Sequence, residues 1–163
     1  MAQSLNNLAA LYQVQGRYAE AEPLYRRGLA IWEKALGREH PNVAASLNNL
    51  AELYRAQGRY AEAEPLYEKA LAIVEKTLGP EHPHLAASLS NLAELYDAQG
   101  RHLKAEPLFQ NSLAIFEKAL GPEHPRVALG LENYAALLRQ LDREAEAQVL
   151  EARAKAIRAS HGE

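Results

Sequence analysis

The sequence contains no cysteine in its 163 residues. This absence excludes a disulfide framework, thiolate chemistry and a zinc–thiolate site, and it favours a reducing compartment, so we expect a cytoplasmic location. No apolar run approaches the ~20 residues that a membrane span requires. No basic segment followed by an apolar one precedes Leu5, so we expect no signal peptide and no membrane partner.

Charges of both signs are present, but neither is concentrated. Charged residues make up 24% of the sequence, and the net charge is −3. A nucleic-acid-binding surface requires clustered basic residues, so we expect no nucleic-acid partner. The sequence also lacks a His-Glu-x-x-His helix, a nucleophile elbow and a glycine-rich phosphate loop. We therefore expect a protein that is not an enzyme and that holds no metal or cofactor.

What the sequence does contain is an internal repeat of 42 residues. The segment Leu47–Tyr67 recurs from Leu5 and from Leu89, and a more divergent copy starts at Leu131. Between residues 5–41 and 47–83, 28 of 37 positions are identical. A fixed period of this length predicts a stack of supersecondary units. We divide the chain into a single array of four repeats, residues 1–41, 42–83, 84–125 and 126–163.

Each repeat contains two helical patterns. In the second repeat, apolar residues recur at the spacing of one helix face: Val43, Leu47, Leu50 and Tyr54. Gly58 ends this pattern, a second apolar pattern covers residues 63–74, and Gly79 ends that one. Pro83 suits the first position of the next helix. A proline also lies inside each second pattern, as Pro65 does here, and we expect a continuous helix with a slight bend rather than a helix that starts at the proline.

Six of these positions match the packing pattern of a known repeat: Leu50, Ala51, Tyr54, Ala63, Tyr67 and Ala70. The sequence resembles a tetratricopeptide repeat, whose usual length is 34 residues. The 42-residue period, with Leu-Asn-Asn-Leu-Ala and Ala-Glu-Pro-Leu-Tyr, resembles the kinesin light chain subfamily. The resemblance implies an all-α, right-handed superhelical solenoid of four antiparallel helix pairs. It also implies a protein–protein interaction scaffold that binds an extended peptide in its concave groove.

The two ends of the array differ. In the last repeat, three apolar packing positions have become charged, namely Glu151, Lys155 and Arg158, which predicts a polar C-terminal cap. Asp142 stands where the other repeats have glycine, so we expect the backbone of that turn to be less favourable. The first repeat has no such cap, which leaves open whether the sequence is a fragment of a longer array. We expect end-to-end self-association through this first repeat.

Two repeated patterns invite a functional interpretation. Glu39-His40 and its copies in the next two linkers could form metal or acid–base pairs, but a loop and helix-start motif explains them better, because neighbouring repeats are too far apart to share one ion. Aromatic residues recur at the positions of Tyr12 and Tyr25 and could form a base-stacking platform. Their fixed helical spacing favours core packing instead.

The resemblance implies that the first helix of each repeat lines the groove. Carried over, the polar groove positions and predicted peptide-binding residues are Asn6, Asn7, Asn48, Asn49, Glu52, Arg55, Ser90, Asn91, Glu94, Asp97, Glu132, Asn133 and Arg139. The remaining groove positions are Gln3, Ala10, Gln13, Ala45, Ala87, Leu129 and Ala136. The mixed charges among them favour a client with both signs and a slight basic bias.

One asparagine recurs at the same groove position in all four repeats, as Asn7, Asn49, Asn91 and Asn133. Asparagine is a poor residue for a helix interior, and its amide can pair with both a peptide N–H and a peptide C=O. We predict that the four amides form a ladder along a bound peptide. Two alternatives stay open: a structural hydrogen bond between neighbouring helices, and a structural or self-assembling array without a peptide client.

Overall fold

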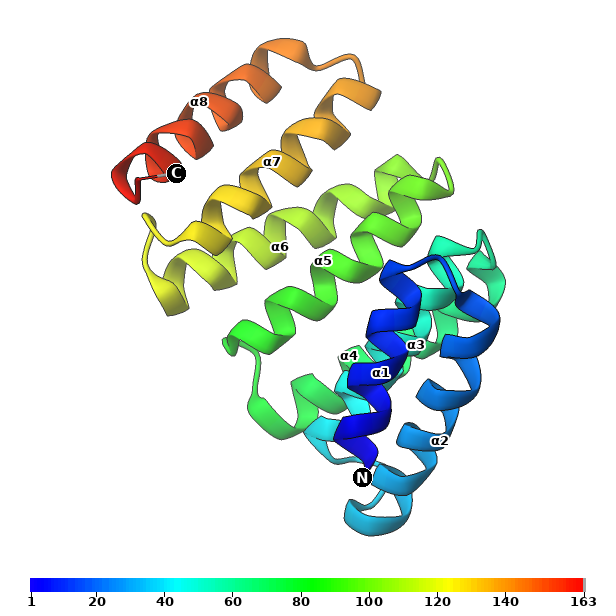
Figure 1. Cartoon of the computed structure of the whole chain (residues 1–163). Helices are drawn as coiled ribbons and strands as arrows, with labels where there is room; N and C mark the ends of the chain where they lie inside the picture. The colour runs from blue at the N-terminus through cyan, green and yellow to red at the C-terminus, as the bar shows by residue number, and fades with distance from the viewer. Residues whose placement is uncertain (163) are drawn as a thin grey trace. The chain divides into compact units, whose positions relative to one another are not determined.

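The computed structural model describes residues 1–162, which form eight α-helices and no strand (Figure 1). Helices account for 83% of the chain. Their bounds are α1 Ala2–Val14, α2 Tyr18–Leu36, α3 Pro41–Ala56, α4 Tyr60–Leu78, α5 Pro83–Ala98, α6 His102–Leu120, α7 Pro125–Gln140 and α8 Glu144–Ser160. The predicted alternation of a first and a second helix in each repeat is thus confirmed.

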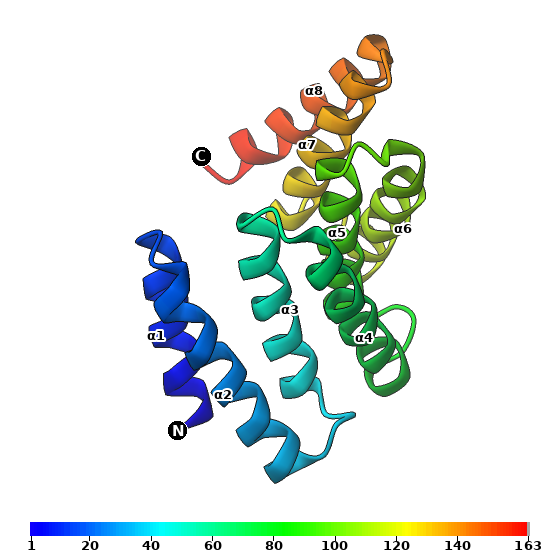
Figure 2. The same cartoon turned by 90° about the vertical axis from the view of Figure 1, so that its right-hand side faces the viewer.

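The chain divides into two compact units, Met1–Gly79 with α1 to α4 and Pro80–Glu163 with α5 to α8. In unit 1, α2 packs against both α1 and α3, and in unit 2, α7 packs against both α6 and α8 (Figure 1 and Figure 2). Each unit is therefore two helical hairpins in which the second helix of one hairpin covers the first helix of the next.

The turns follow the predicted glycine and proline signals. Gly79 ends α4 with a φ of 89°, a left-handed backbone that glycine adopts without strain. Pro83 then begins α5. Asp142 has a φ of 58° between α7 and α8, which makes it the one non-glycine residue with positive φ in the described residues. The predicted strain of this turn is confirmed, because a residue with a side chain pays an energetic cost in the left-handed region of backbone conformation.

The internal prolines do not start their helices. Pro23 lies inside α2, which begins five residues earlier at Tyr18. Pro65 and Pro107 lie at the same position of α4 and α6. The prediction of continuous helices is confirmed. Each proline stands close to the first turn, where few helical hydrogen bonds depend on its missing N–H.

Alanines and large apolar residues share the core. Ala44, Ala51 and Ala63 have no exposed surface, which lets the helices of unit 1 approach closely around Tyr67. In unit 2, Phe109 packs with Tyr134 and Leu137 in one buried cluster. The prediction of core positions is confirmed for Tyr25, Tyr54, Tyr67 and Phe109, which are buried, whereas Tyr12 and Tyr96 are half-buried. No helix in residues 1–162 has both the length and the apolar character of a membrane span.

Candidate functional site

Unit 1 has a cavity of about 430 Å³ where α1, α2 and α3 meet. Its lining residues are Ala10, Gln13, Val14, Tyr18, Tyr25, Asn49, Glu52 and Ala56. Four of them, Ala10, Gln13, Asn49 and Glu52, are predicted groove positions. The structure therefore brings groove positions of two successive repeats together at one hollow.

The polar groups of this cavity are largely paired with one another. Tyr25 donates its hydroxyl hydrogen to Gln13 Oε1 at 3.0 Å, and Tyr67 donates to Glu52 Oε2 at 2.8 Å. Arg55 forms an ion pair with the same Glu52 at 2.7 Å. Burial, followed by the charge of Glu52, raises the pKa of Tyr67 above its ordinary value, so this phenol remains a donor. The negative charge of Glu52 is thus already compensated.

Unit 2 has a cavity of about 300 Å³ between α5, α6 and α7. Its lining residues are Ala87, Ser90, Asn91, Glu94, Phe116, Arg126, Leu129, Gly130 and Asn133. Phe116 supplies an apolar wall, and the Arg126 guanidinium lies 5.9 Å from its ring centroid. Gly130 stands where the other repeats carry serine, and a Cβ there would come to 3.4 Å of Leu113. The cavity combines an apolar wall with two groove asparagines.

The four repeated asparagines have three different environments. In the described residues, the amides of Asn49 and Asn91 make no hydrogen bond to another protein group, although each lines the cavity of its unit. Asn133 donates to Glu94 Oε1 at 3.0 Å, which is the structural hydrogen bond between neighbouring helices that we left open. Asn7 is exposed and accepts from Gln3 Nε2 at 2.9 Å.

Asn6 does not belong to the exposed groove, and its prediction as a solvated contact residue is wrong. Its side chain is only 6% exposed and donates to Ser46 Oγ at 3.0 Å. A Cβ on Gly28 would come within 2.4 Å of Asn6 Oδ1, so the asparagine occupies space that glycine leaves on α2. The reason is that this helix position faces the second helix. Ser90, at the same position, correspondingly bonds to Ser112 Oγ at 2.7 Å.

Several other predicted contact residues are engaged within their own unit. Asp97 Oδ1 lies 2.7 Å from His102 Nδ1. Glu132 forms an ion pair with Arg158 at 2.7 Å, and this arginine lowers the pKa of the Glu132 carboxyl. Arg139 pairs with Glu144 at 2.9 Å and also contacts Glu151. Asn48 is half-buried. The charged residues of α8 thus bind groove residues of α7, a pairing that the sequence reading did not foresee.

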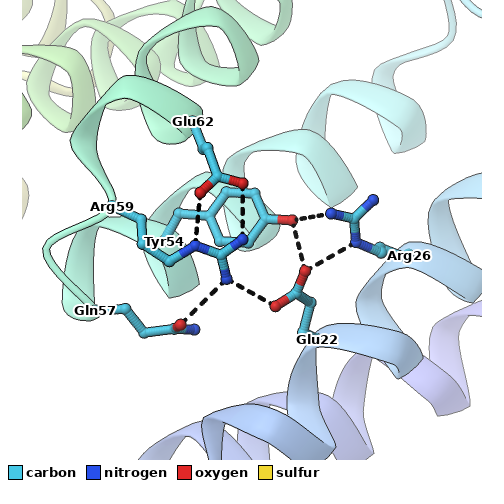
Figure 3. Close-up of polar contacts among 6 residues, drawn as sticks. All are labelled: Glu22, Arg26, Tyr54, Gln57, Arg59 and Glu62. Carbon is cyan, nitrogen blue, oxygen red and sulfur yellow. Dashed lines mark hydrogen bonds and ion pairs between the residues drawn. The ribbon is translucent and has the colours of Figure 1, made fainter.

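A polar cluster between the first two repeats was also missed. We call it the Glu22 cluster, made of Glu22, Arg26, Tyr54 and Arg59 (Figure 3). Glu22 accepts hydrogen bonds from the Tyr54 hydroxyl at 3.0 Å and from Arg59 Nη1 at 2.8 Å, and it pairs with Arg26 at 3.0 Å. The Arg59 guanidinium lies 4.1 Å from the Tyr54 ring centroid. The cluster joins α2 to α3 and to the turn before α4.

Unit 2 contains a corresponding Glu106 cluster, made of Glu106, Gln110, Tyr134 and Arg143. Glu106 Oε1 accepts from the Tyr134 hydroxyl at 2.9 Å and from Arg143 Nη1 at 2.5 Å, and Gln110 donates to the same hydroxyl at 2.7 Å. Part of the signal was present in the sequence, because the glutamate before proline and the arginine recur at the repeat period. The tyrosine does not, since Tyr134 stands at the repeat position of Leu50 rather than that of Tyr54. These residues hold neighbouring repeats together.

The linker histidines cap helices. His40 Nδ1 accepts from the backbone N–H of Asn42 at 3.1 Å, and His82 and His124 do the same for the residues two positions on. Each satisfies one of the free N–H groups of a helix start. The interpretation as a helix-start motif is confirmed. Residues 1–162 contain no group of three or more His, Cys, Asp or Glu residues that could hold a metal ion.

Comparison with known proteins agrees with this architecture. The profile of the tetratricopeptide repeat family matches residues 1–76, 46–110 and 85–160. The chain belongs to the tetratricopeptide repeat family. The curated proteins that were searched contain no match to the sequence.

Solved structures narrow the resemblance to kinesin light chain-like repeats. BtubC (BKLC) from P. vanneervenii is 26% identical with a TM-score of 0.87, over 99% of this chain and 64% of that one. Two structures of a putative kinesin light chain from Podosopora anserina, with nearly identical TPR-like repeats, are 36% and 37% identical with TM-scores of 0.81 and 0.77. They are matched over 99% and 98% of this chain and 76% of theirs. The predicted fold class, an all-α tetratricopeptide solenoid of helix pairs, is confirmed.

Proposed function

We propose that this protein–protein interaction scaffold binds extended peptide segments at the cavities of its two units. Tetratricopeptide repeats generally mediate protein–protein interaction. The observation that carries the proposal is the pair Asn49 and Asn91. Each amide lines its unit's cavity, and neither makes a hydrogen bond to another protein group in the described residues. Asn49 is exposed and Asn91 is half-buried, so both amides are accessible and offer a ligand a donor and an acceptor that no protein group occupies.

An amide at this position suits a main chain. It offers a donor and an acceptor together, so it can pair with the N–H and C=O of an extended peptide without regard to side-chain sequence. In unit 2, Asn91 and Asn133 line the same cavity, and Glu94 accepts from Asn133, which fixes the orientation of that amide. Phe116 and Leu129 would contact an apolar side chain of the peptide. The contribution expected from each lost hydrogen bond is about 0.5–1.5 kcal/mol.

Charge pairing changes the client that we expect. Glu52 is compensated by Arg55, and Asp97 lies within hydrogen-bond distance of His102, so the basic bias inferred from these acids is weakened. A client with few charges and an apolar anchor side chain fits the two cavities better than a strongly basic peptide. We propose that specificity comes from the residues that differ between the cavities: Tyr18 and Tyr25 in unit 1, and Phe116, Arg126 and Leu129 in unit 2.

The test is selection of peptides by display on the whole chain, followed by affinity measurements on variants. Asn49→Ala with Asn91→Ala is expected to weaken binding of a selected peptide by about 5- to 50-fold, with no loss of helix content. Asn111→Ala is the matched control, because Asn111 is an exposed asparagine of α6 that lines neither cavity. Unchanged affinity in the double variant would show that these amides are not the binding surface.

A second function is favoured by a separate observation. The groove acid Glu132 pairs with Arg158, and Arg139 pairs with Glu144 and Glu151. Charges that bind each other across α7 and α8 are what a purely structural array requires. This alternative predicts that display recovers no peptide whose binding depends on either cavity.

A further inference from the structure

The apolar face of α1 is an uncovered copy of a face that is covered elsewhere. Leu8 and Leu11 of α1 are 39% and 53% exposed. Leu50 and Leu53, at the same positions of α3, are 4% and 0% exposed. The difference arises because α2 packs on α3, whereas among residues 1–162 no second helix of another repeat packs on α1. In unit 2, α6 covers α7 in the same way, and Leu137 is 0% exposed.

The polar residues beside this face, Tyr12 and Arg17, match the Tyr54 and Arg59 part of the Glu22 cluster but lack the glutamate among residues 1–162. The Arg17 guanidinium lies 4.1 Å from the Tyr12 ring centroid and binds Glu20 and Gln15. Arg59 has the same arrangement with Tyr54, Glu62 and Gln57. What differs is the carboxylate of the preceding second helix. Arg59 and Tyr54 share Glu22, but no such carboxylate faces Arg17 and Tyr12 among residues 1–162.

We propose that the α1 face, defined by Leu8, Leu11, Tyr12 and Arg17, is a docking surface for the second helix of a further repeat of this type. The recognition group is a glutamate followed by proline, placed as Glu22 is placed in α2. Its carboxylate accepts from the Tyr12 hydroxyl and from Arg17 Nη1. The Glu22 cluster is a completed example of this contact. The Glu106 cluster repeats its glutamate–arginine part, with the hydroxyl supplied by Tyr134 from a position one helical turn before that of Tyr12.

A second copy of this chain does not supply that helix. Helices α2 and α6 already cover α3 and α7. Glu64 of α4 already has an interaction partner. Helix α8 has Gln148 in place of the glutamate, and charged residues where the other second helices are apolar. The partner is therefore a helix of another repeat segment that carries both the apolar face and the acid.

The test extends the whole chain by one repeat. A copy of residues 43–84 is fused directly before Met1, which keeps the 42-residue period and brings the copied Glu64 to the position that Glu22 holds relative to Tyr54. Hydrogen exchange of the α1 amides is then measured. We expect the extension to slow exchange in α1 at least about 10-fold. Glu64→Gln in the copy is expected to remove part of that protection, so that exchange of the α1 amides becomes about 3- to 10-fold faster than in the extended chain.

Two variants identify the contact. Arg17→Ala in the extended chain is expected to lose as much protection as the copied Glu64→Gln, and the two together no more than either alone. Glu75→Gln in the copy is the matched control, because Glu75 is an exposed acid of the same helix that lies 11 residues beyond Glu64 and contacts no cation in the described residues. A second extension, built from a copy of residues 1–42, supplies Glu22 itself and must give the same result if the first one folds poorly.

Three results would overturn the proposal. One is unchanged α1 exchange in both extended chains. Another is full additivity of the Arg17 and Glu64 substitutions, which would show that the two groups do not meet. The third is a concentration-dependent dimer of the unextended chain that Leu11→Glu abolishes, since a second copy would then occupy the face. None of these measurements involves a groove peptide, so the proposed peptide binding stands or fails independently.

Discussion

In unit 1 the cluster glutamate accepts hydrogen bonds from two arginines and a tyrosine, whereas its counterpart in unit 2 accepts from one arginine and a tyrosine. The difference comes from one position, which is Arg26 in α2 and Gln110 in α6. Both side chains donate to the tyrosine hydroxyl, at 2.6 and 2.7 Å. The tyrosine hydroxyl also comes from different repeat positions, since Tyr134 stands where unit 1 has Leu50. The glutamate and the turn arginine are therefore the constant part of the inter-repeat contact, and the other donors can change.

The cavities differ more than the clusters do. Unit 1 presents two tyrosines around one unpaired amide, and unit 2 presents a phenylalanine, an arginine and two asparagines. The helices that build them have equal lengths in α3, α5 and α7, with 16 residues each. The repeated sequence therefore determines the helical scaffold, and a few substitutions on it change the chemical lining of each cavity.

The largest effect is expected in the covered leucines of the two units. Leu53→Ala and Leu137→Ala should each lower the free energy of unfolding by about 2–5 kcal/mol, because both side chains are fully buried. Leu11→Ala, at the same position of the uncovered α1, should cost less than about 1 kcal/mol. Urea denaturation measures all three. Equal losses at Leu11 and Leu53 would mean that the α1 face is covered in solution.

The next effect is a pH dependence in the Glu22 cluster. Hydrogen bonding from Arg59, reinforced by Tyr54 and Arg26, lowers the pKa of Glu22 in the folded chain. A folded pKa below the unfolded value gives stability that is present above the ordinary glutamate pKa of about 4.3 and is lost as the pH falls through the folded value. Glu22→Gln should cost about 1 kcal/mol at neutral pH.

The same variant should approach the parent protein in stability as the pH falls below about 4. Unfolding free energies measured from pH 7 to pH 3 test this. Glu68→Gln is the control, because this exposed carboxylate has no cationic partner in the described residues. A constant deficit of Glu22→Gln at every pH would contradict the assigned role of the charge.

Most of the fold could be predicted because its signals are local and recur. Gly79 and Pro83, which separate α4 from α5, each mark a turn by backbone chemistry that does not depend on the tertiary structure. The period then repeats these signals, so an ambiguous position such as Pro23 can be judged from Pro65. Asp142 was identified for the same reason, as a departure from a glycine that the other copies share.

The site was harder to predict because it depends on which neighbour a side chain meets. Asn6 and Asn7 are adjacent on one helix, yet one is buried against Gly28 and Ser46 and the other is exposed. A rotation of 100° per residue separates these outcomes, and a family-based assignment of groove positions does not resolve it. The ion pairs of Glu132 and Arg139 likewise depend on α8, whose charged positions looked like a solvated cap.

A gain in stability is expected at the turn where unit 2 departs from unit 1. Asp142 has a φ of 58°, whereas Gly58 occupies the corresponding turn of unit 1 with a φ of 71°. Asp142→Gly should raise the free energy of unfolding by about 0.5–1 kcal/mol, because glycine relieves the left-handed strain at some entropic cost. Gly58→Asp should lose a similar amount. Thermal unfolding of both variants decides the point, and a loss at Asp142→Gly would show that the aspartate makes an unrecognised contact.

A smaller effect should follow from exchanging the variable position of the two clusters. Gln110→Arg gives Glu106 a second arginine and should stabilise the chain by about 0.3–0.5 kcal/mol at low salt. Arg26→Gln should lose a similar amount in unit 1. High salt should reduce both changes, since these side chains are partly exposed and screening weakens their pairing. Changes that do not respond to salt would indicate packing rather than charge as their cause.

The smallest net effect is expected at the groove asparagines, where two contributions oppose each other. Alanine is the better helix former by up to about 0.7 kcal/mol, so Asn49→Ala and Asn91→Ala should slightly stabilise the chain in the absence of ligand. Asn133→Ala gains the same propensity but loses the hydrogen bond to Glu94, worth about 0.5–1.5 kcal/mol, so its net change should be close to zero or unfavourable. Urea midpoints of the three single variants, with Asn111→Ala as the propensity control, separate the two contributions. If Asn49→Ala and Asn91→Ala destabilise the chain as Asn133→Ala does, the repeated asparagine is a structural residue in every copy, and the amides proposed to bind a peptide have no free role.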